Sequence, residues 1–182
     1  AETHKQADAR KRAARADFDK WLAVATPDGM APPVPTDGLR LHAPFNEGQG
    51  KTVNLTVDGE PRAVSLDAGV AWDAGHIAAK AFKTRPGGTI ELPDVGDFDK
   101  DEGFSYGAWV KLTKNGQYGA ILAREDDGHD YRGYDLWVQN DRVGAHFIHK
   151  WQDDALKVVS KNPLKVGQWN HVFISYDGSG KA

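Results

Sequence analysis

The sequence predicts an all-β body, a sandwich or a barrel, preceded by a single α-helix. Three observations support this fold class. The first 25 residues are rich in alanine and charge, with apolar residues at helical spacing. From Leu39 onward the apolar period changes to two. Short alternating segments, separated by Gly, Asp, Asn and Pro, then recur at roughly 8–12-residue intervals, which is typical of antiparallel β domains.

Length and composition limit the class of protein before any motif is considered. The chain has 182 residues, is 40% hydrophobic and carries a net charge of −3, as expected of a slightly acidic globular domain with an appendage. No basic face stands out, so no nucleic-acid partner is expected. Cysteine is absent, which excludes disulfides and thiolate metal sites. No apolar run is long enough to span a membrane, and no apolar leader is present, so we expect a processed or internal piece of a longer chain.

The helix is predicted within residues 5–25, where one narrow apolar stripe repeats at helical spacing. Its members are Ala14, Phe18, Trp21, Leu22 and Ala25. Pro27-Asp28-Gly29 ends this helix, and APPVP at 31–35 is a stiff, extended spacer. Residues 1–38 are therefore interpreted as helix and linker, and residues 39–182 as the β domain. The helix either docks on its own domain or belongs to a preceding one.

Strands are predicted wherever apolar and polar residues alternate, because successive side chains of a strand point to opposite faces. The alternating segments are 39–45, 52–57 and 104–112. Residues 169–176, WNHVFISY, are apolar on both faces and are predicted to form a central strand.

The stretch RGYDLWVQNDRVGAHFIHKW, 132–151, predicts a hairpin around a two-residue loop, Asn140-Asp141. This register places three pairs on the core face: Val138 with Val143, Leu136 with Ala145, and Tyr134 with Phe147. It places Trp137 across from Gly144 and Asp135 across from His146 on the opposite face, which also carries Arg142. A two-residue or a four-residue loop gives this register, whereas a three-residue loop would break it.

A tryptophan facing outward among polar residues suggests a ligand platform. Glycine across from Trp137 leaves room for the indole to lie flat, and Trp109, flanked by Gly107 and Lys111, repeats the pattern on another strand. Flat indoles beside polar side chains suit a pyranose, which offers an apolar face and hydroxyl groups. The alternative is that a loop or the helix covers this face, so that both tryptophans belong to the core. The candidate ligand-binding residues are Trp137, Asp135, His146, Arg142 and Trp109.

No metal or cofactor is expected. Asp97, Asp99 and Asp101 in GDFDKDEG would be the ligands if calcium were bound, but their spacing does not fit an EF-hand. His146 and His149 are three residues apart on a strand, so they point to opposite faces and cannot share a metal ion.

Catalytic motifs are also missing, and the protein is expected not to be an enzyme. The sequence contains no GxSxG, HExxH or GxxxxGK. A retaining glycosidase needs two carboxyl groups about 5–5.5 Å apart, and no strand supplies alternating acids on one face.

Four segments together resemble the laminin-G-like domain, a concanavalin A-like lectin/glucanase sandwich. They are GFSYGAWVKL (103–112), ILAR (121–124), the 134–151 hairpin and PLKVGQWNHVFISYDGSGKA (163–182). With the preceding charged helix, they look most like the version found in large multi-domain planctomycete cytochrome-c-type proteins. The resemblance implies an antiparallel jelly roll, an extracytoplasmic location and binding of a carbohydrate or protein ligand. Relatives continue beyond YDGSGKA, so we expect a C-terminally truncated domain with an open sheet edge.

Together these features predict a non-catalytic, lectin-like carbohydrate-binding module of a larger extracytoplasmic protein. Its expected partners are a polysaccharide or glycan and the neighbouring domains of the same polypeptide. The alternative is a structural or docking module that orients those domains and has no ligand of its own.

Overall fold

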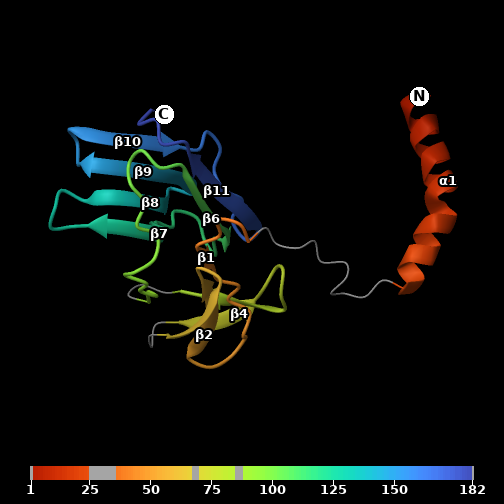
Figure 1. Cartoon of the computed structure of the whole chain (residues 1–182), viewed down its shortest axis with the longest axis horizontal. Helices are drawn as coiled ribbons and strands as arrows, with labels where there is room; N and C mark the ends of the chain where they lie inside the picture. Colours follow the sequence, from red (N-terminus) through yellow and green to blue (C-terminus); the bar gives the residue numbers. More distant parts are fainter. Residues whose placement is uncertain (1, 25–35, 67–69, 85–87, 182) are drawn as a thin grey trace. The chain divides into compact units, whose positions relative to one another are not determined.

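The computed structural model describes residues 2–24, 36–66, 70–84 and 88–181. It shows one helix followed by eleven strands, which form antiparallel sheets (Figure 1). The predicted fold class, an all-β antiparallel body preceded by one N-terminal helix, is confirmed. The chain divides into two compact units, Ala1–Leu39 and Arg40–Ala182. The predicted helix stop at 27–29, the spacer at 31–35 and Ala25 lie outside the described residues.

The first unit contains helix α1, Glu2–Val24. Its apolar stripe is present, with Phe18 and Trp21 in aromatic contact at 5.6 Å between ring centroids. An Arg15–Asp19 ion pair one turn apart supports the helix locally. In the part of the chain that the structure describes, no helix is both long and apolar enough to cross a membrane.

A four-stranded sheet in the order β10-β9-β8-β7 forms one layer of the second unit. Its strands are β7 (Gly119–Asp126), β8 (Arg132–Gln139), β9 (Arg142–Lys150) and β10 (Asp154–Val159). The predicted hairpin register is confirmed, because Val138 pairs with Val143 and Trp137 with Gly144. Asn140 and Asp141 both have positive φ angles, 51° and 62°, as a two-residue type I′ turn requires.

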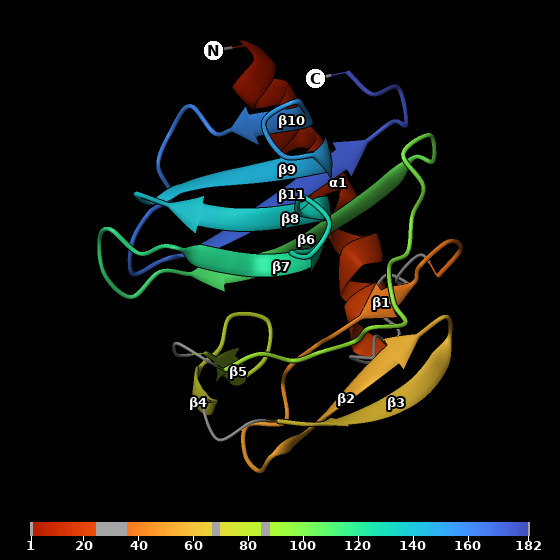
Figure 2. The same ribbon diagram turned by 90° about the vertical axis from the view of Figure 1, so that its left-hand side faces the viewer.

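The second layer consists of β6 (Phe104–Lys111) and β11 (Trp169–Tyr176). Figure 2 shows these two strands behind the four-stranded sheet. Val172 of β11 packs between the layers against Leu136 and Ala145, the two hairpin residues predicted to face the core. Within the described residues β11 pairs with β6 alone, so it is an edge strand and its predicted central position is wrong.

The remaining strands form two smaller sheets around a core of their own. They are β1 (Leu41–His42), β2 (Thr52–Val57), β3 (Glu60–Ser65), β4 (Ala71–Ala74) and β5 (Lys80–Lys83). Val53, Leu55 and Leu66 are the buried centre of this second core. The predicted strand at 39–45 shrinks to two residues. Phe45 adopts a positive φ of 49°, which is incompatible with an extended strand.

Candidate functional site

Trp137 lies flat on the outer face of the four-stranded sheet, the face turned away from β6 and β11. A Cβ atom added to Gly144 would stand 2.2 Å from Cζ2 of the indole, so glycine is what allows this position. The indole stacks on the His146 ring at 5.3 Å and 26°, and Lys157 Nζ lies 5.1 Å from the indole centroid. Trp137 is therefore half-buried, with part of its face already in contact with neighbouring side chains.

Asp135 is buried on this same outer face, although a sheet surface facing away from the core is ordinarily solvated. Its Oδ2 lies 2.9 Å from His146 Nδ1, and the His146 backbone amide donates to its Oδ1 at 2.6 Å. Both carboxylate oxygens are thus held by one residue of the neighbouring strand. Such a pair satisfies a buried charge that would otherwise be very costly.

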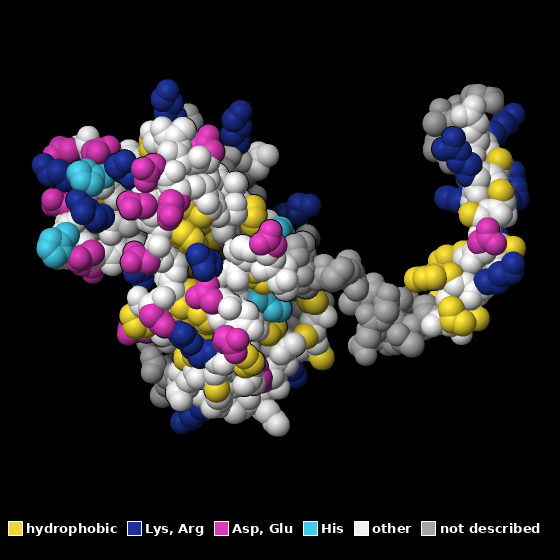
Figure 3. Space-filling view, in the orientation of Figure 1, with side chains coloured by type: hydrophobic (Ala, Val, Ile, Leu, Met, Phe, Trp, Pro, Cys, Tyr) yellow, Lys and Arg dark blue, Asp and Glu magenta, His cyan; other side chains and the backbone are white. Residues whose placement is uncertain are grey.

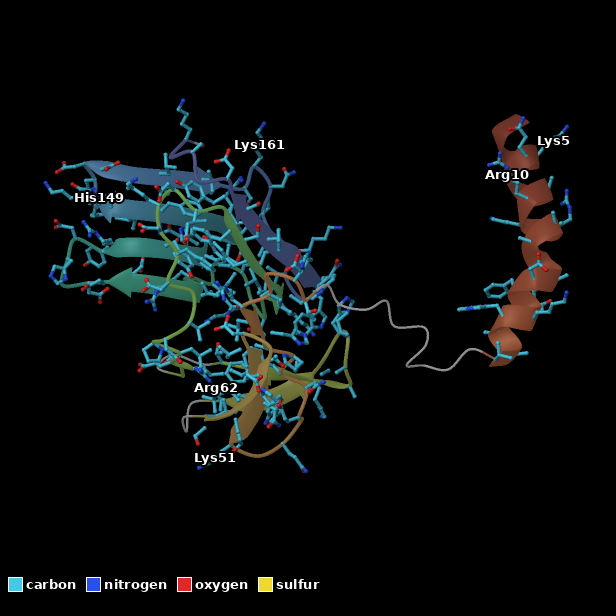
Figure 4. All side chains as sticks on the ribbon, in the orientation of Figure 1. Lys5, Arg10, Lys51, Arg62, His149 and Lys161 are labelled. Atoms are coloured by element: carbon cyan, nitrogen blue, oxygen red, sulfur yellow. The ribbon has the colours of Figure 1, made fainter. Side chains whose placement is uncertain are left out.

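A pocket of about 320 Å³ opens beside this pair. It is lined by Glu125, Tyr131, Asp135, His146, Ile148 and Trp151. The turns β7–β8 and β9–β10 meet at this end of the sheet, where the Trp151 amide donates to the Asp130 carbonyl at 3.0 Å. Figure 4 labels His149 at this end, and Figure 3 shows charged side chains of both signs around it.

Two aromatic residues from these turns flank the pocket. Trp151 makes an edge-to-face contact with the His146 ring at 5.2 Å, and Tyr131 lies 6.4 Å from Trp151 between ring centroids. Within the described residues, His146 Nε2 and Trp137 Nε1 are buried and have no hydrogen-bond partner. The pocket therefore combines aromatic surface with an unsatisfied polar atom on one of its lining residues.

Glu125 is a site residue that the sequence did not predict, as are Tyr131 and Trp151. A β-bulge between Ala120 and Leu122 shifts the pairing of β7, which then sets Glu125 opposite Gly133, two residues from Asp135. Burial, the charge of Asp135 and a hydrogen bond to its carboxylate together raise the pKa of the Glu125 carboxyl to about 7. An acid pair thus lies on one face, built across two strands rather than by alternation along one strand.

The other two predicted ligand residues lie elsewhere. Arg142 directs its guanidinium to backbone carbonyls, donating to Ser160 O at 2.8 Å and also contacting Lys161 O. Trp109 lies on the outer face of the β6–β11 sheet, between His76 at 4.4 Å and His171 at 5.0 Å. Since the two sheets are opposite layers, Trp109 and Trp137 do not belong to one site.

The three aspartates proposed for calcium do not gather into a site. Asp97 pairs with Arg124 at 3.1 Å, and Asp99 accepts a hydrogen bond from the Lys100 amide. In the described parts of the chain, no three His, Asp or Glu side chains are arranged to hold a metal ion. His149 turns away from His146 and pairs with Asp154 at 3.2 Å.

An antiparallel β domain with an aromatic-lined pocket on an outer sheet face is the architecture of a lectin-like binding module. The comparison with protein families agrees. The chain belongs to the concanavalin A-like lectin/glucanases superfamily, whose family description matches residues 83–182. No curated protein and no solved structure matches the chain.

Proposed function

We propose that this domain is a non-catalytic carbohydrate-binding module of a larger extracytoplasmic protein. The observation that carries the proposal is the pocket, which places Tyr131 and Trp151 beside the buried, hydrogen-bonded Asp135. Aromatic rings stack on the apolar face of a pyranose, while fixed polar groups bind its hydroxyls. A bound hydroxyl group would also supply a partner for His146 Nε2. A glycan and the neighbouring domains of the polypeptide are the partners of this proposal.

The acid pair supports binding rather than hydrolysis. Glycosidase carboxyl groups stand about 5–5.5 Å apart in retaining enzymes and farther apart in inverting ones, with the scissile bond between them. The Asp135 carboxylate raises the pKa of Glu125, so the two groups interact with each other. Asp135 is also committed on both oxygens to His146 and is not free to act as a nucleophile.

The experiment compares three tryptophan variants in binding to an array of neutral and charged polysaccharides. Trp151→Ala removes a pocket wall and should weaken binding by about 1 kcal/mol or more, the scale of aromatic contacts. Trp137→Ala should weaken binding indirectly, because the indole supports the His146 ring. Trp109→Ala, on the other layer, is the matched control and should leave binding unchanged. Equal loss in all three variants, or no polysaccharide bound at all, would contradict the proposal.

A second candidate function is docking to a neighbouring domain of the same polypeptide. The outer face of β6 and β11 favours it, because Trp109 and Phe173 remain 44% and 60% exposed there. Exposed aromatic residues of this kind are enriched at protein interfaces. In that case Trp109→Ala would loosen the arrangement of domains in the full-length protein, measured by small-angle scattering, without any change in polysaccharide binding.

A further inference from the structure

We infer that the pocket is built for a positively charged sugar, an amino sugar whose ammonium group lies between the Glu125–Asp135 pair and the rings of Tyr131 and Trp151. This inference rests on the proposed carbohydrate-binding function and names the ligand class. It draws on the charge of the pocket floor, the aromatic residues of its rim and the proton held by the acid pair.

The floor of the pocket is negatively charged. The Asp135 side chain is 10% exposed, and Glu125 lies at the solvent-facing rim of the pocket on the neighbouring strand. Asp127 adds a further negative charge close to Glu125. Among the described residues that line the pocket there is no Lys or Arg, and His146 is already engaged by Asp135. A carboxylate-bearing sugar would meet repulsion here, whereas an ammonium group would be attracted.

The aromatic residues at the rim add a second preference for positive charge. Tyr131 and Trp151 meet nearly at right angles, with an interplanar angle of 69°. Both are only partly covered, so their ring faces are open to a ligand. Cations are attracted to the negative face of such rings, and sites that recognise ammonium groups commonly combine aromatic faces with acidic side chains. A neutral sugar would gain the stacking contact alone.

The acid pair also contains a proton that a cation can replace. The pKa of Glu125 is raised to about 7, so below that pH its carboxyl group, which lines the pocket together with Asp135, is protonated. As pH rises through 7 this proton leaves, the floor gains one negative charge, and the affinity for a cation should increase. Ammonium binding and proton binding therefore compete for the same two carboxyl groups.

Three pairs of charged groups lie near Glu125, in addition to the charge of Asp127. On the two turns these are Asp126 with His129, Lys150 with Asp153, and His149 with Asp154. On β10, Lys157 lies over the Trp137 ring. The charges of the three pairs compensate one another locally, whereas those of Asp127 and Lys157 act beside the Glu125–Asp135 pair.

The test measures binding of three β-1,4-linked trimers to the whole chain by calorimetry at pH 6.5. The trimers of glucosamine, glucose and N-acetylglucosamine differ only at C2, where they carry an ammonium group, a hydroxyl group or an uncharged amide. We expect the glucosamine trimer to bind roughly tenfold more tightly than the glucose trimer, on the scale of one partly screened charge pair. A trimer of N,N,N-trimethylglucosamine, whose charge does not titrate, should bind more tightly at pH 8 than at pH 6.

Two variants make the test specific to the acid pair. Glu125→Gln should abolish the pH dependence and reduce the preference for the glucosamine trimer over the glucose trimer. Asp154→Asn removes one acid from an exposed pair outside the pocket lining and should change neither quantity. Unchanged melting temperatures would show that both variants fold.

The outcomes separate the two proposals. If the glucose and glucosamine trimers bind equally well, the inferred preference for an amino sugar is overturned and the carbohydrate-binding function stands. If a preference exists but survives Glu125→Gln unchanged, the acid pair is not its source and the inference is likewise overturned. If none of the trimers and no polysaccharide of the array binds, the carbohydrate-binding function itself is overturned.

Discussion

Each outer face of the sandwich carries an aromatic side chain beside a glycine of the neighbouring strand, and the two faces differ in the residues around that pair. On the four-stranded sheet Trp137 lies over Gly144, and on the other sheet Phe173 lies close to Gly107. Beside Trp137 is Asp135, which is the one buried charged side chain among the described residues. Beside Phe173 are His171 and Trp109, both exposed to solvent.

This difference shows that an outward aromatic residue does not define a site by itself. The turns β7–β8 and β9–β10 rise beside one face and supply Tyr131 and Trp151, and with them a pocket. No residue of β6 or β11 lines this pocket. A buried ionic pair together with walls from turns therefore distinguishes a candidate binding site from a surface patch.

The largest expected effect comes from Asp135. Asp135→Ala removes the partner of His146 inside the sheet and should lower the free energy of unfolding by about 3 kcal/mol, the scale for breaking a buried ion pair. Asp154→Ala breaks a His–Asp pair on the solvent side and should cost about 1 kcal/mol or less. Urea unfolding of both variants measures the two values. Equal losses would mean that the buried and exposed pairs do not differ as their burial indicates.

A smaller effect is expected from the glycine beneath the indole. Gly144→Ala forces Trp137 off the sheet and should destabilise the domain by about 2 kcal/mol, as overpacking does. At Gly103 an added Cβ would make only an ordinary contact of 3.5 Å with the Tyr176 carbonyl, so Gly103→Ala should change stability by about 0.5 kcal/mol or less. Thermal unfolding distinguishes the two. A neutral Gly144→Ala would show that the indole moves freely.

The smallest effect concerns pH. Because the pKa of Glu125 is raised from 4.5 to about 7 by folding, the folded state holds a proton that the unfolded state has lost. The contribution of Glu125 to the free energy of unfolding is therefore complete below pH 4.5 and is lost as pH rises to about 7. Glu125 lies at the solvent-facing rim, so screening reduces the effect to about 1 kcal/mol. Glu125→Gln should remove this part of the decline, measured as unfolding free energy from pH 4.5 to 8. An unchanged pH profile would contradict the assignment.

The hairpin could be predicted because its signals are local. Alternation fixes which residues face the core, and Asn140 and Asp141 belong to the residue types that tolerate positive φ. The register that follows also gave the Asp135–His146 and Trp137–Gly144 neighbours. The strand register does not predict the burial of Asp135, because that burial depends on the turns around the pocket.

The sequence did not predict that Glu125, Tyr131 and Trp151 belong to the site, and the reason here is different. The bulge near Ala120 changes the face to which later residues of β7 point, and nothing in the local alternation marks it. Tyr131 and Trp151 lie in two separate turns, brought together by one backbone hydrogen bond. Arg142 has the correct register position, but its long side chain reaches the backbone of the 160–161 segment instead.

The bond between the Trp151 amide and the Asp130 carbonyl joins two turns that are otherwise independent of the strand register. Turns accept substitution and insertion far better than paired strands do. The aromatic walls of the pocket therefore lie outside the strands, whereas its acid pair, Glu125 and Asp135, lies within them. Libraries confined to the 127–131 and 151–153 segments could diversify recognition on an unaltered sheet, in the way that exchangeable loops on a fixed framework yield new binders.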